Sequence, residues 1–478
     1  MPPAQSGLAF GLLLTLTLLL RTTAARADGT FPEPRQILLP ADRPEQIILG
    51  TNFGLIFSED SGKTWLFSCE RGLSNYAGPY LLGAQTPHRI FALTSGAGLI
   101  RSDDDSCSWQ AAETSSDLLL FSVAVDPANA QRVYTTGAPR NDLRNGQSIY
   151  VSDDGGLSLG KTVFTSPAGS AVLSVLVAPS RPSRLFATMF STPENHPIVL
   201  RSDDAGEHWD VAADAVESLG ENPFQLLAID AHDENKLYVR ILGAFAETLA
   251  TSADGGQSFV QSASIPGKLN AFIKLASGTI IVAGTAGIDA VGYRSKDGGR
   301  TFEAWPRAPH GHALAERGGK LYIAGDGYAD GYAIAESDDE GDHVTPLAGF
   351  SQVQAVKSCV GELCTDACAY YSGVGLWPQA ACGAVSTPTV PDDSSGAGGD
   401  TGTATGAGGA SAAAGGSGTG ETGERPGLRV FGGGCACELA GKRPADSWVL
   451  LLAGLMLAAA RRLRRATGAA RAHVRYGL

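Results

Sequence analysis

Seven copies of a short segment, here called a box, carry the residues whose types and spacing could do chemistry. The pattern is Ser-x-Asp-x-Gly-x-Thr/Ser-aromatic, first seen from Ser58 to Trp65, and its serines are 44, 50, 50, 50, 43 and 42 residues apart. Carboxylates and hydroxyls could bind calcium or act in acid–base catalysis. The box residues are Ser58, Asp60, Gly62, Trp65, Ser102, Asp104, Trp109, Ser152, Asp154, Gly156, Ser202, Asp204, Gly206, Trp209, Ser252, Asp254, Gly256, Phe259, Ser295, Asp297, Gly299, Phe302, Ser337, Asp339 and Gly341.

A structural role explains the boxes better than catalysis or metal binding. A calcium site needs several converging oxygen ligands, whereas each box offers one or two carboxylates. Ser and Asp side chains can instead bond the backbone N–H groups of their own turn, and Gly accepts a positive φ without steric cost. The terminal aromatic can wedge between neighbouring units. The boxes therefore predict tight turns, with no catalytic residue, metal or cofactor.

The elements that position these turns are short strands. In the third unit, apolar runs at 123–127, 132–135 and 148–151 precede the box, and a fourth run follows it. Four such runs in every 40 to 50 residues are typical of a β-propeller blade. The sequence therefore predicts an all-β fold, a seven-bladed β-propeller spanning residues 31–350.

The box pattern resembles the Asp-box, or BNR repeat, of sialidase-like and sortilin-like propellers. Photosystem assembly factors and xyloglucan-active hydrolases carry the same repeat. The resemblance covers about residues 37–348 and implies the fold, but this superfamily mixes enzymes with binding proteins. It leaves open a binding module, a glycoside hydrolase and an assembly or scaffolding factor.

Departures from the enzyme relatives favour a non-catalytic binding module for a glycan or protein partner. The resemblance to sialidases would imply an Arg-Ile-Pro signature near the first blade, where this chain has Gly54-Leu-Ile56. Xyloglucan-active relatives place a cleft between two propellers, whereas this chain predicts one. Glycosidases also need two carboxyl groups facing each other across the sugar. A sialidase-like or other glycoside hydrolase remains the alternative.

Loops on the face opposite the boxes are the candidate binding face, because binding residues commonly lie on loops of a rigid scaffold. His310 and His312 could share a metal only with a third ligand, which the sequence does not indicate. We therefore expect exposed loop histidines. The candidate residues are Tyr76, Arg140, Asp142, Arg144, His196 and His310.

Six cysteines before residue 385 are disulfide candidates. Cys69 and Cys107 follow the first box and interrupt the second, so we expect a bridge between them, with free thiols as the alternative. Within the Cys-rich segment 351–385, the spacing lacks a Cys-x-x-Cys knuckle and favours two disulfides over a zinc site. Its cysteines are Cys359, Cys364, Cys368 and Cys382, whose connectivity stays open.

Both ends of the chain predict export. Residues 1–27 have the apolar run and Ala-x-Ala site of a secretory signal peptide. Residues 386–431 are rich in Gly, Ala, Ser and Thr and predict a disordered linker. Residues 432–478 contain Cys435, Cys437, an apolar helix at 448–460 and an arginine cluster. This order resembles the MYXO-CTERM sorting signal of myxobacteria, which implies a processing protease and display on a Gram-negative surface; a simple membrane anchor is the alternative.

The net charge of the chain indicates which class of partner is not expected. The 478 residues carry a formal net charge of −13, and no basic stripe with interleaved aromatics precedes the C-terminal tail. Binding to nucleic acid depends on neutralising phosphates with Lys and Arg. We therefore expect no nucleic-acid partner, and a membrane contact only through the tail until it is processed.

Overall fold

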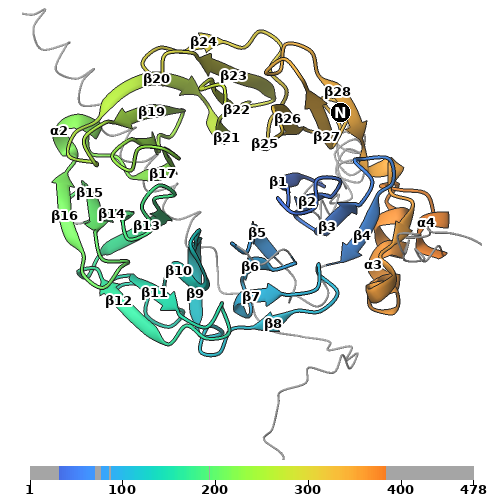
Figure 1. Ribbon diagram of the computed structural model, residues 1–478, viewed down its shortest axis with the longest axis horizontal. Helices are drawn as coiled ribbons and strands as arrows, with labels where there is room; N and C mark the ends of the chain where they lie inside the picture. Colours follow the sequence, from blue (N-terminus) through green and yellow to red (C-terminus); the bar gives the residue numbers. More distant parts are fainter. Residues whose placement is uncertain (1–31, 70–76, 85–87, 193, 384–478) are drawn as a thin grey trace, which may run out of the picture. The chain divides into compact units, whose positions relative to one another are not determined.

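A computed structural model describes residues 32–69, 77–84, 88–192 and 194–383. Their strands form seven sheets arranged around a central opening, six with four antiparallel strands and one, in the first blade, with a fifth strand described below (Figure 1). Each sheet uses four consecutive strands, and the first of the four lies innermost. The predicted seven-bladed β-propeller is confirmed.

The strands of the first four blades have the following bounds. Blade 1 contains β1 (Pro34–Leu38), β2 (Ile47–Thr51), β3 (Gly54–Ser58) and β4 (Leu66–Cys69). Blade 2 contains β5 (Ala77–Leu82), β6 (Ile90–Thr94), β7 (Gly98–Ser102) and β8 (Gln110–Ala111). Blade 3 contains β9 (Leu118–Asp126), β10 (Asn129–Pro139), β11 (Ser148–Ser152) and β12 (Lys161–Thr165). Blade 4 contains β13 (Ser170–Val177), β14 (Leu185–Ser191), β15 (His196–Ser202) and β16 (Asp210–Asp214).

The remaining blades follow the same plan. Blade 5, preceded by the short helix α2 (Val216–Leu219), contains β17 (Phe224–Ile229), β18 (Leu237–Ile241), β19 (Ala246–Ser252) and β20 (Val260–Pro266). Blade 6 contains β21 (Lys268–Lys274), β22 (Ile280–Ala286), β23 (Asp289–Ser295) and β24 (Glu303–Ala304). Blade 7 contains β25 (Ala313–Arg317), β26 (Lys320–Ala324), β27 (Ile334–Ser337) and β28 (Thr345–Ala348).

The third strand of every blade ends at the serine of its box, so all seven boxes connect a third strand to a fourth. In an antiparallel sheet, these connections lie at the same end as those between first and second strands. We call this end of the ring the box face. The other end, with the connections between second and third strands and between blades, is the loop face.

Apolar side chains pack between blades, and the residue that ends each box contributes to this core. Trp65 of blade 1 is buried against Tyr322 and Ile334 of blade 7. Phe259 of blade 5 packs in the same way with Phe186 of blade 4. The wedge role expected of the box aromatic is therefore visible at both seams.

The ring closes without exchanging a strand between its first and last blades. Residues 350–383, here called the clasp, leave blade 7 and run along the outer edge of blade 1 (Figure 1). The clasp contains η2 (Phe350–Gln352), β29 (Ala355–Val356), η3 (Ser358–Val360), α3 (Gly361–Gly373) and α4 (Ala380–Gly383). Strand β29 pairs in parallel with β4, the outer strand of blade 1.

The clasp shares one apolar core with blades 1 and 7. Trp377 packs on Phe67 at 4.8 Å between ring centroids, and Tyr371 packs on Phe53 at 4.9 Å. Cys364 and Cys368 are fully buried in this cluster. The Cys-rich segment therefore continues the hydrophobic core of the ring.

All six candidate cysteines form disulfides, but the expected Cys69–Cys107 bridge is wrong. The bridges are Cys69–Cys364, Cys107–Cys359 and Cys368–Cys382. The expectation of two disulfides within the Cys-rich segment is therefore also wrong, because only Cys368–Cys382 lies within it. Cys69 ends β4 and pairs with Gly54 at the loop-face end, whereas Cys107 lies in a box-face turn. The Ser68 side chain faces the second box, where it contacts Ser106. Because successive side chains of a strand point to opposite faces, Cys69 points away from Cys107 and meets Cys364 of the clasp instead.

Within the described residues, no helix is both long and apolar enough to span a membrane. The signal peptide, the linker from 386, and the tail with Cys435, Cys437 and the 448–460 helix lie outside the described residues.

Candidate functional site

The box turns are built from hydrogen bonds within each turn. Ser58 Oγ accepts a hydrogen bond from the Gly62 amide at 2.7 Å and donates to Asp60 Oδ1 at 3.0 Å. Asp60 Oδ1 also accepts from the Thr64 amide at 2.8 Å, and Oδ2 accepts from the Thr64 hydroxyl at 2.8 Å. The serine contacts recur in the other six boxes. In the fourth and seventh boxes, a histidine ring nitrogen takes the place of the hydroxyl beside the aspartate.

The box hydrogen bonds hold all seven aspartates as carboxylates. Burial alone would raise the pKa of Asp60, but hydrogen bonds from Thr64, Ser58 and Lys63 outweigh it and lower the pKa. In exposed Asp204, the backbone and side chain of His208 lower the pKa to about 2. The pKa is also lowered in the other five, Asp104, Asp154, Asp254, Asp297 and Asp339. A general acid needs a raised pKa. The lowered pKa values of the box aspartates therefore fit a structural role in the turns.

The second box departs from the pattern. Ser106 occupies the glycine position with φ of +72°, and Asp105 before it has φ of +54°. Ser106 donates a hydrogen bond to Ser68 of blade 1 at 2.8 Å. The buried ammonium of Lys357 donates to the Asp105 carbonyl at 2.7 Å. This box is therefore the place where the clasp reaches blade 2.

Other polar groups of the box face connect neighbouring blades. Arg101 of blade 2 donates to the Gly155 carbonyl in the third box at 2.7 Å. The Tyr134 hydroxyl donates to Ala205 O at 2.8 Å, and Trp305 Nε1 donates to Gly341 O at 3.0 Å. In each case a side chain of one blade holds the box of the next.

The residues predicted for the binding face lie on the loop face but do not converge. Arg140, Asp142 and Arg144 lie in the loop after β10, His196 begins β15, and His310 precedes β25. These residues thus occupy blades 3 and 4 and the entry to blade 7. Tyr76 lies outside the described residues.

The predicted binding residues also have contacts within the protein. The Arg140 guanidinium donates to the Ser116 carbonyl at 2.8 Å, and Asp142 accepts from Asn145 at 2.8 Å. His196 lies 3.3 Å from Asp214. Arg144 is exposed.

The expectation that His310 and His312 are exposed loop residues is wrong, because both are half-buried. His310 Nδ1 lies 2.9 Å from Asp330, and its Nε2 lies 3.0 Å from the Ile288 carbonyl. Burial would lower the pKa of His310, but these contacts raise it. Burial lowers the pKa of His312. Within the described ranges, no group of three or more His, Cys, Asp or Glu side chains could hold a metal ion.

Sequence reasoning missed large apolar side chains at the tips of three loops on the loop face. Phe245, Ile288 and Tyr328 are 92%, 91% and 87% exposed, and each lies between the second and third strands of its blade. Each stands beside Gly or Ala: Gly243-Ala-Phe-Ala246, Gly287-Ile288 and Gly327-Tyr-Ala329. An apolar residue in a small-residue turn, where polar residues are usual, was the available signal.

A chain of contacts joins these three tips across blades 5, 6 and 7. The Phe245 carbonyl accepts from the Gly267 amide at 2.9 Å. Gly267 lies against Ala286, two residues before Ile288. His310 bridges the Ile288 carbonyl to Asp330, which lies in the loop of Tyr328. We call Phe245, Ile288 and Tyr328 the apolar rim.

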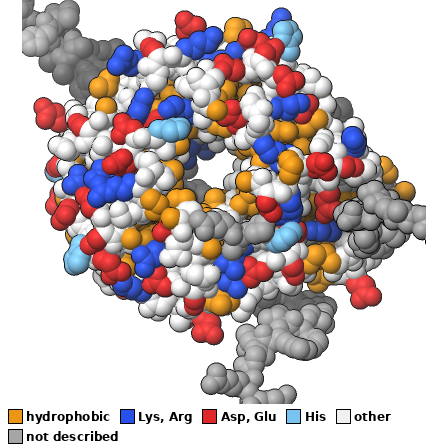
Figure 2. Space-filling model, in the orientation of Figure 1, with side chains coloured by type: hydrophobic (Ala, Val, Ile, Leu, Met, Phe, Trp, Pro, Cys, Tyr) orange, Lys and Arg blue, Asp and Glu red, His pale blue; other side chains and the backbone are white. Residues whose placement is uncertain are grey.

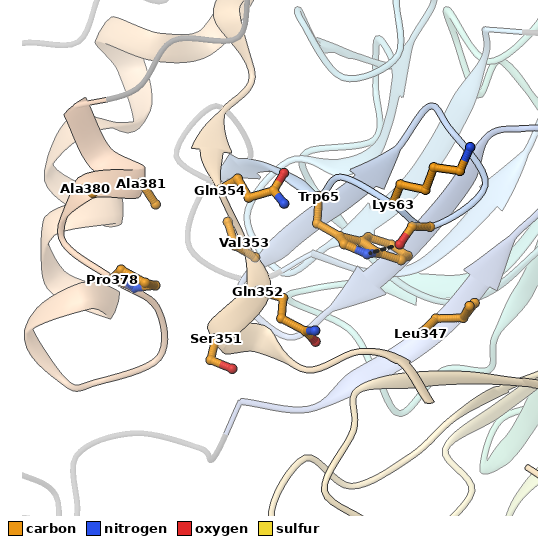
Figure 3. A pocket seen from close by; sticks show the side chains of 11 residues that line it. Lys63, Trp65, Leu347, Ser351, Gln352, Val353, Gln354, Pro378, Ala380 and Ala381 are labelled. Carbon is orange, nitrogen blue, oxygen red and sulfur yellow. Dashed lines mark hydrogen bonds between the residues drawn. The ribbon is translucent and has the colours of Figure 1, made fainter. Parts of the chain in front are cut away.

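One hollow with a defined lining lies away from the loop face. It is a cavity of about 350 Å³ at the outer edge of blade 1 (Figure 3). Trp65 and Lys63 of the first box and Leu347 of β28 form one wall, and the clasp forms the other through Gln352 and Pro378. The ring itself is open at its centre, and charges of both signs are scattered over the face seen in Figure 2.

Comparisons with known proteins find similarity among solved structures. No protein-family model and no curated protein matches the chain. Among solved structures, it is similar to a GH74 xyloglucanase from Xanthomonas campestris, with 16% identity over 68% of this chain and 60% of that chain, and a TM-score of 0.35. YCF48 from Cyanidioschyzon merolae matches with 14% identity over 62% of this chain and 94% of that one, with a TM-score of 0.44.

A third structure, YCF48 bound to D1 peptide, has 15% identity over 54% of this chain and 78% of that one, with a TM-score of 0.38. At these identities the likeness concerns the fold alone. The chain spans about 60% of the length of the xyloglucanase.

Proposed function

We propose that this protein is an exported, surface-displayed binding module that holds a protein or glycan partner on its loop face without catalysing a reaction. The observation that carries the proposal is the apolar rim, with three large side chains between 87% and 92% exposed on consecutive blades. Exposed apolar side chains gathered at one place mark interaction sites. Aromatic anchors of this kind dominate the binding energy of many interfaces.

Two acidic side chains close to the rim support binding over glycoside hydrolysis. Glu247 is buried and accepts from the Leu269 amide at 2.9 Å, and Asp330 accepts from the amides of His310 and Asp326. A glycosidase needs two carboxyl groups free to face a sugar. Glu247 and Asp330 each hold a loop in place, whereas Asp289, next to Ile288, is exposed.

Between the two partner classes, the side-chain types favour a protein. Sugars stack on flat aromatic faces, whereas the middle member of the rim, Ile288, is aliphatic. Large exposed apolar anchors next to Gly and Ala suit pockets on a protein surface. Export is supported by the three disulfides, which persist in oxidising compartments. Surface display rests on the resemblance of the tail to a sorting signal.

Position-specific photo-crosslinking on intact cells tests the proposal. A photoreactive residue placed at Ile288 should capture a defined partner, and the same residue at Val260, 67% exposed on the outer strand β20, should not. Capture at Ile288 should disappear when Phe245 and Tyr328 are changed to Ser. Equal capture from both positions would contradict a binding role for the loop face.

A glycan array probed with residues 28–385 separates the remaining alternatives. Binding that the Phe245→Ser/Ile288→Ser/Tyr328→Ser variant loses would assign a glycan partner to the same face. The Val211→Ser/Val260→Ser variant, which removes exposed valines from outer strands, is the matched control. Turnover of any glycoside by this fragment would overturn the non-catalytic assignment in favour of a glycoside hydrolase.

A further inference from the structure

The three disulfides differ in their accessibility to solvent. Cys69–Cys364 and Cys368–Cys382 each contain at least one fully buried cysteine, and the Cys69 amide also donates to Cys364 Sγ at 3.1 Å. Cys107–Cys359 joins a half-buried cysteine to an exposed one. Of the three bridges, Cys107–Cys359 is therefore the most open to solvent.

The accessible bridge also makes the longest reach around the ring. The clasp follows blade 7 in the chain and pairs with blade 1, but Cys359 bonds Cys107 in the second box, 252 residues away in sequence. Beside it, Lys357 donates to the Asp105 carbonyl and lies 4.2 Å from the centre of the Phe57 ring. The start of the clasp thus spans blades 7, 1 and 2.

We propose that Cys107–Cys359 is a site of thiol–disulfide exchange on the folded protein, and that it acts as a redox latch between the clasp and blade 2. Accessible disulfides are the labile ones, whereas buried ones resist exchange. The inference rests on the bridges alone and is independent of the proposed binding function.

The exchange requires a dithiol reductant. One thiolate of the reductant attacks Cys359 Sγ, forms a mixed disulfide, and expels the Cys107 thiolate, which takes up a proton. The second thiol of the reductant loses its proton and attacks the mixed disulfide, releasing Cys359, which is protonated in turn. Two electrons and two protons pass from the dithiol to the bridge, and the reductant leaves as a disulfide.

Opening the latch frees one part of the clasp and leaves another in place. Helix α3 and helix α4 keep their buried bridges and their contacts with Phe53 and Phe67. The segment around η3 loses its covalent hold on the second box, where Asp105 and Ser106 already have positive φ. Local opening is therefore expected at residues 355–360 and at the second box.

Graded reduction of the oxidised full chain by dithiothreitol, followed by alkylation and peptide mass spectrometry, tests the site. We expect Cys107 and Cys359 to be labelled first, and the other four bridged cysteines only under conditions that unfold the ring. Labelling of Cys69 and Cys364 at the same reductant concentration would overturn the proposal.

Hydrogen exchange tests the latch. Reduced protein and the Cys107→Ser/Cys359→Ser variant should both show exchange at residues 355–360 and the second box faster by roughly tenfold or more. The Cys368→Ser/Cys382→Ser variant should leave exchange at the second box unchanged. If the first variant fails to fold, the reduced native protein decides alone. Unchanged exchange after Cys107–Cys359 is reduced would overturn the latch.

Discussion

The two faces of the ring use similar side chains for different purposes. On the box face, each aspartate accepts hydrogen bonds from its own turn, and side chains such as Arg101 and Tyr134 hold the box of the next blade. On the loop face, connections vary in length and the apolar rim has large side chains almost fully exposed. A repeated turn on one face can therefore hold the ring together, which leaves the loops of the opposite face free to vary.

The largest expected difference between the faces is in acid. The seven box aspartates have folded-state pKa values below their ordinary value, so their contribution to stability is present above about pH 4 and is lost as the pH falls through the folded values. We expect the Tm to fall steeply between about pH 4 and pH 2. Thermal unfolding followed by circular dichroism at each pH measures this. A flat Tm over that range would contradict the structural role of the boxes.

Two glycines with positive φ compare the faces at matched backbone strain. Gly341 in the seventh box and Gly287 beside Ile288 have φ of +89° and +67°. A Cβ on Gly341 would lie 2.5 Å from the Trp305 ring, whereas a Cβ on Gly287 meets nothing within 4 Å. Gly341→Ala should lower the free energy of unfolding by about 3 kcal/mol or more, and Gly287→Ala by about 1 kcal/mol. Urea denaturation measures both free energies of unfolding. Equal losses in the two variants would contradict the difference in packing between the two faces.

Two aspartates make the same comparison for hydrogen bonds. Asp254 in the fifth box accepts from Ser252, Gln257 and Ser258, and Asp142 on the loop face accepts from Asn145. Asp254→Ala should cost about 2 kcal/mol, because it leaves several turn donors without their acceptor. Asp142→Ala should cost less than about 0.5 kcal/mol. Chemical denaturation measures both losses in free energy of unfolding. A larger loss for Asp142→Ala than for Asp254→Ala would contradict the structural role of the boxes.

The smallest expected effect is at His310 on the loop face. Because its folded-state pKa is raised, its stabilising contribution is present below its ordinary pKa of 6.5 and is lost as the pH rises through the folded value. This contribution to the free energy of unfolding should be below about 1 kcal/mol, since the imidazole of His310 is partly exposed to solvent. His310→Gln should flatten the dependence of Tm on pH between about 6 and 8. If Tm changes with pH in this variant as it does in wild type, the pH dependence belongs to a group other than His310.

The box face could be predicted from the sequence because its chemistry is local. Ser58, Asp60 and Gly62 contact one another within a span of five residues, so each turn can be recognised from its own short sequence. Repetition of the pattern then fixed the number of blades. The third strand was also placed well: 148–151 was predicted, and β11 covers Ser148–Ser152.

The remaining features depend on residues far apart in the sequence. Cys107 meets Cys359 and Cys69 meets Cys364 because the clasp returns to the first two blades after a full circuit of the ring. His310 pairs with Asp330 only once two loops lie side by side. The apolar rim is formed by three loops about 40 residues apart in sequence, and their shared face becomes evident only in the ring.

Thermal unfolding of the Phe245→Ser/Ile288→Ser/Tyr328→Ser variant tests most directly whether the apolar rim contributes to the stability of the fold. We expect a Tm equal to that of wild type and of the Val211→Ser/Val260→Ser control, because side chains that are 87% to 92% exposed contribute little to folding. A fall in Tm as large as that caused by Asp254→Ala would contradict the division between a structural face and a binding face.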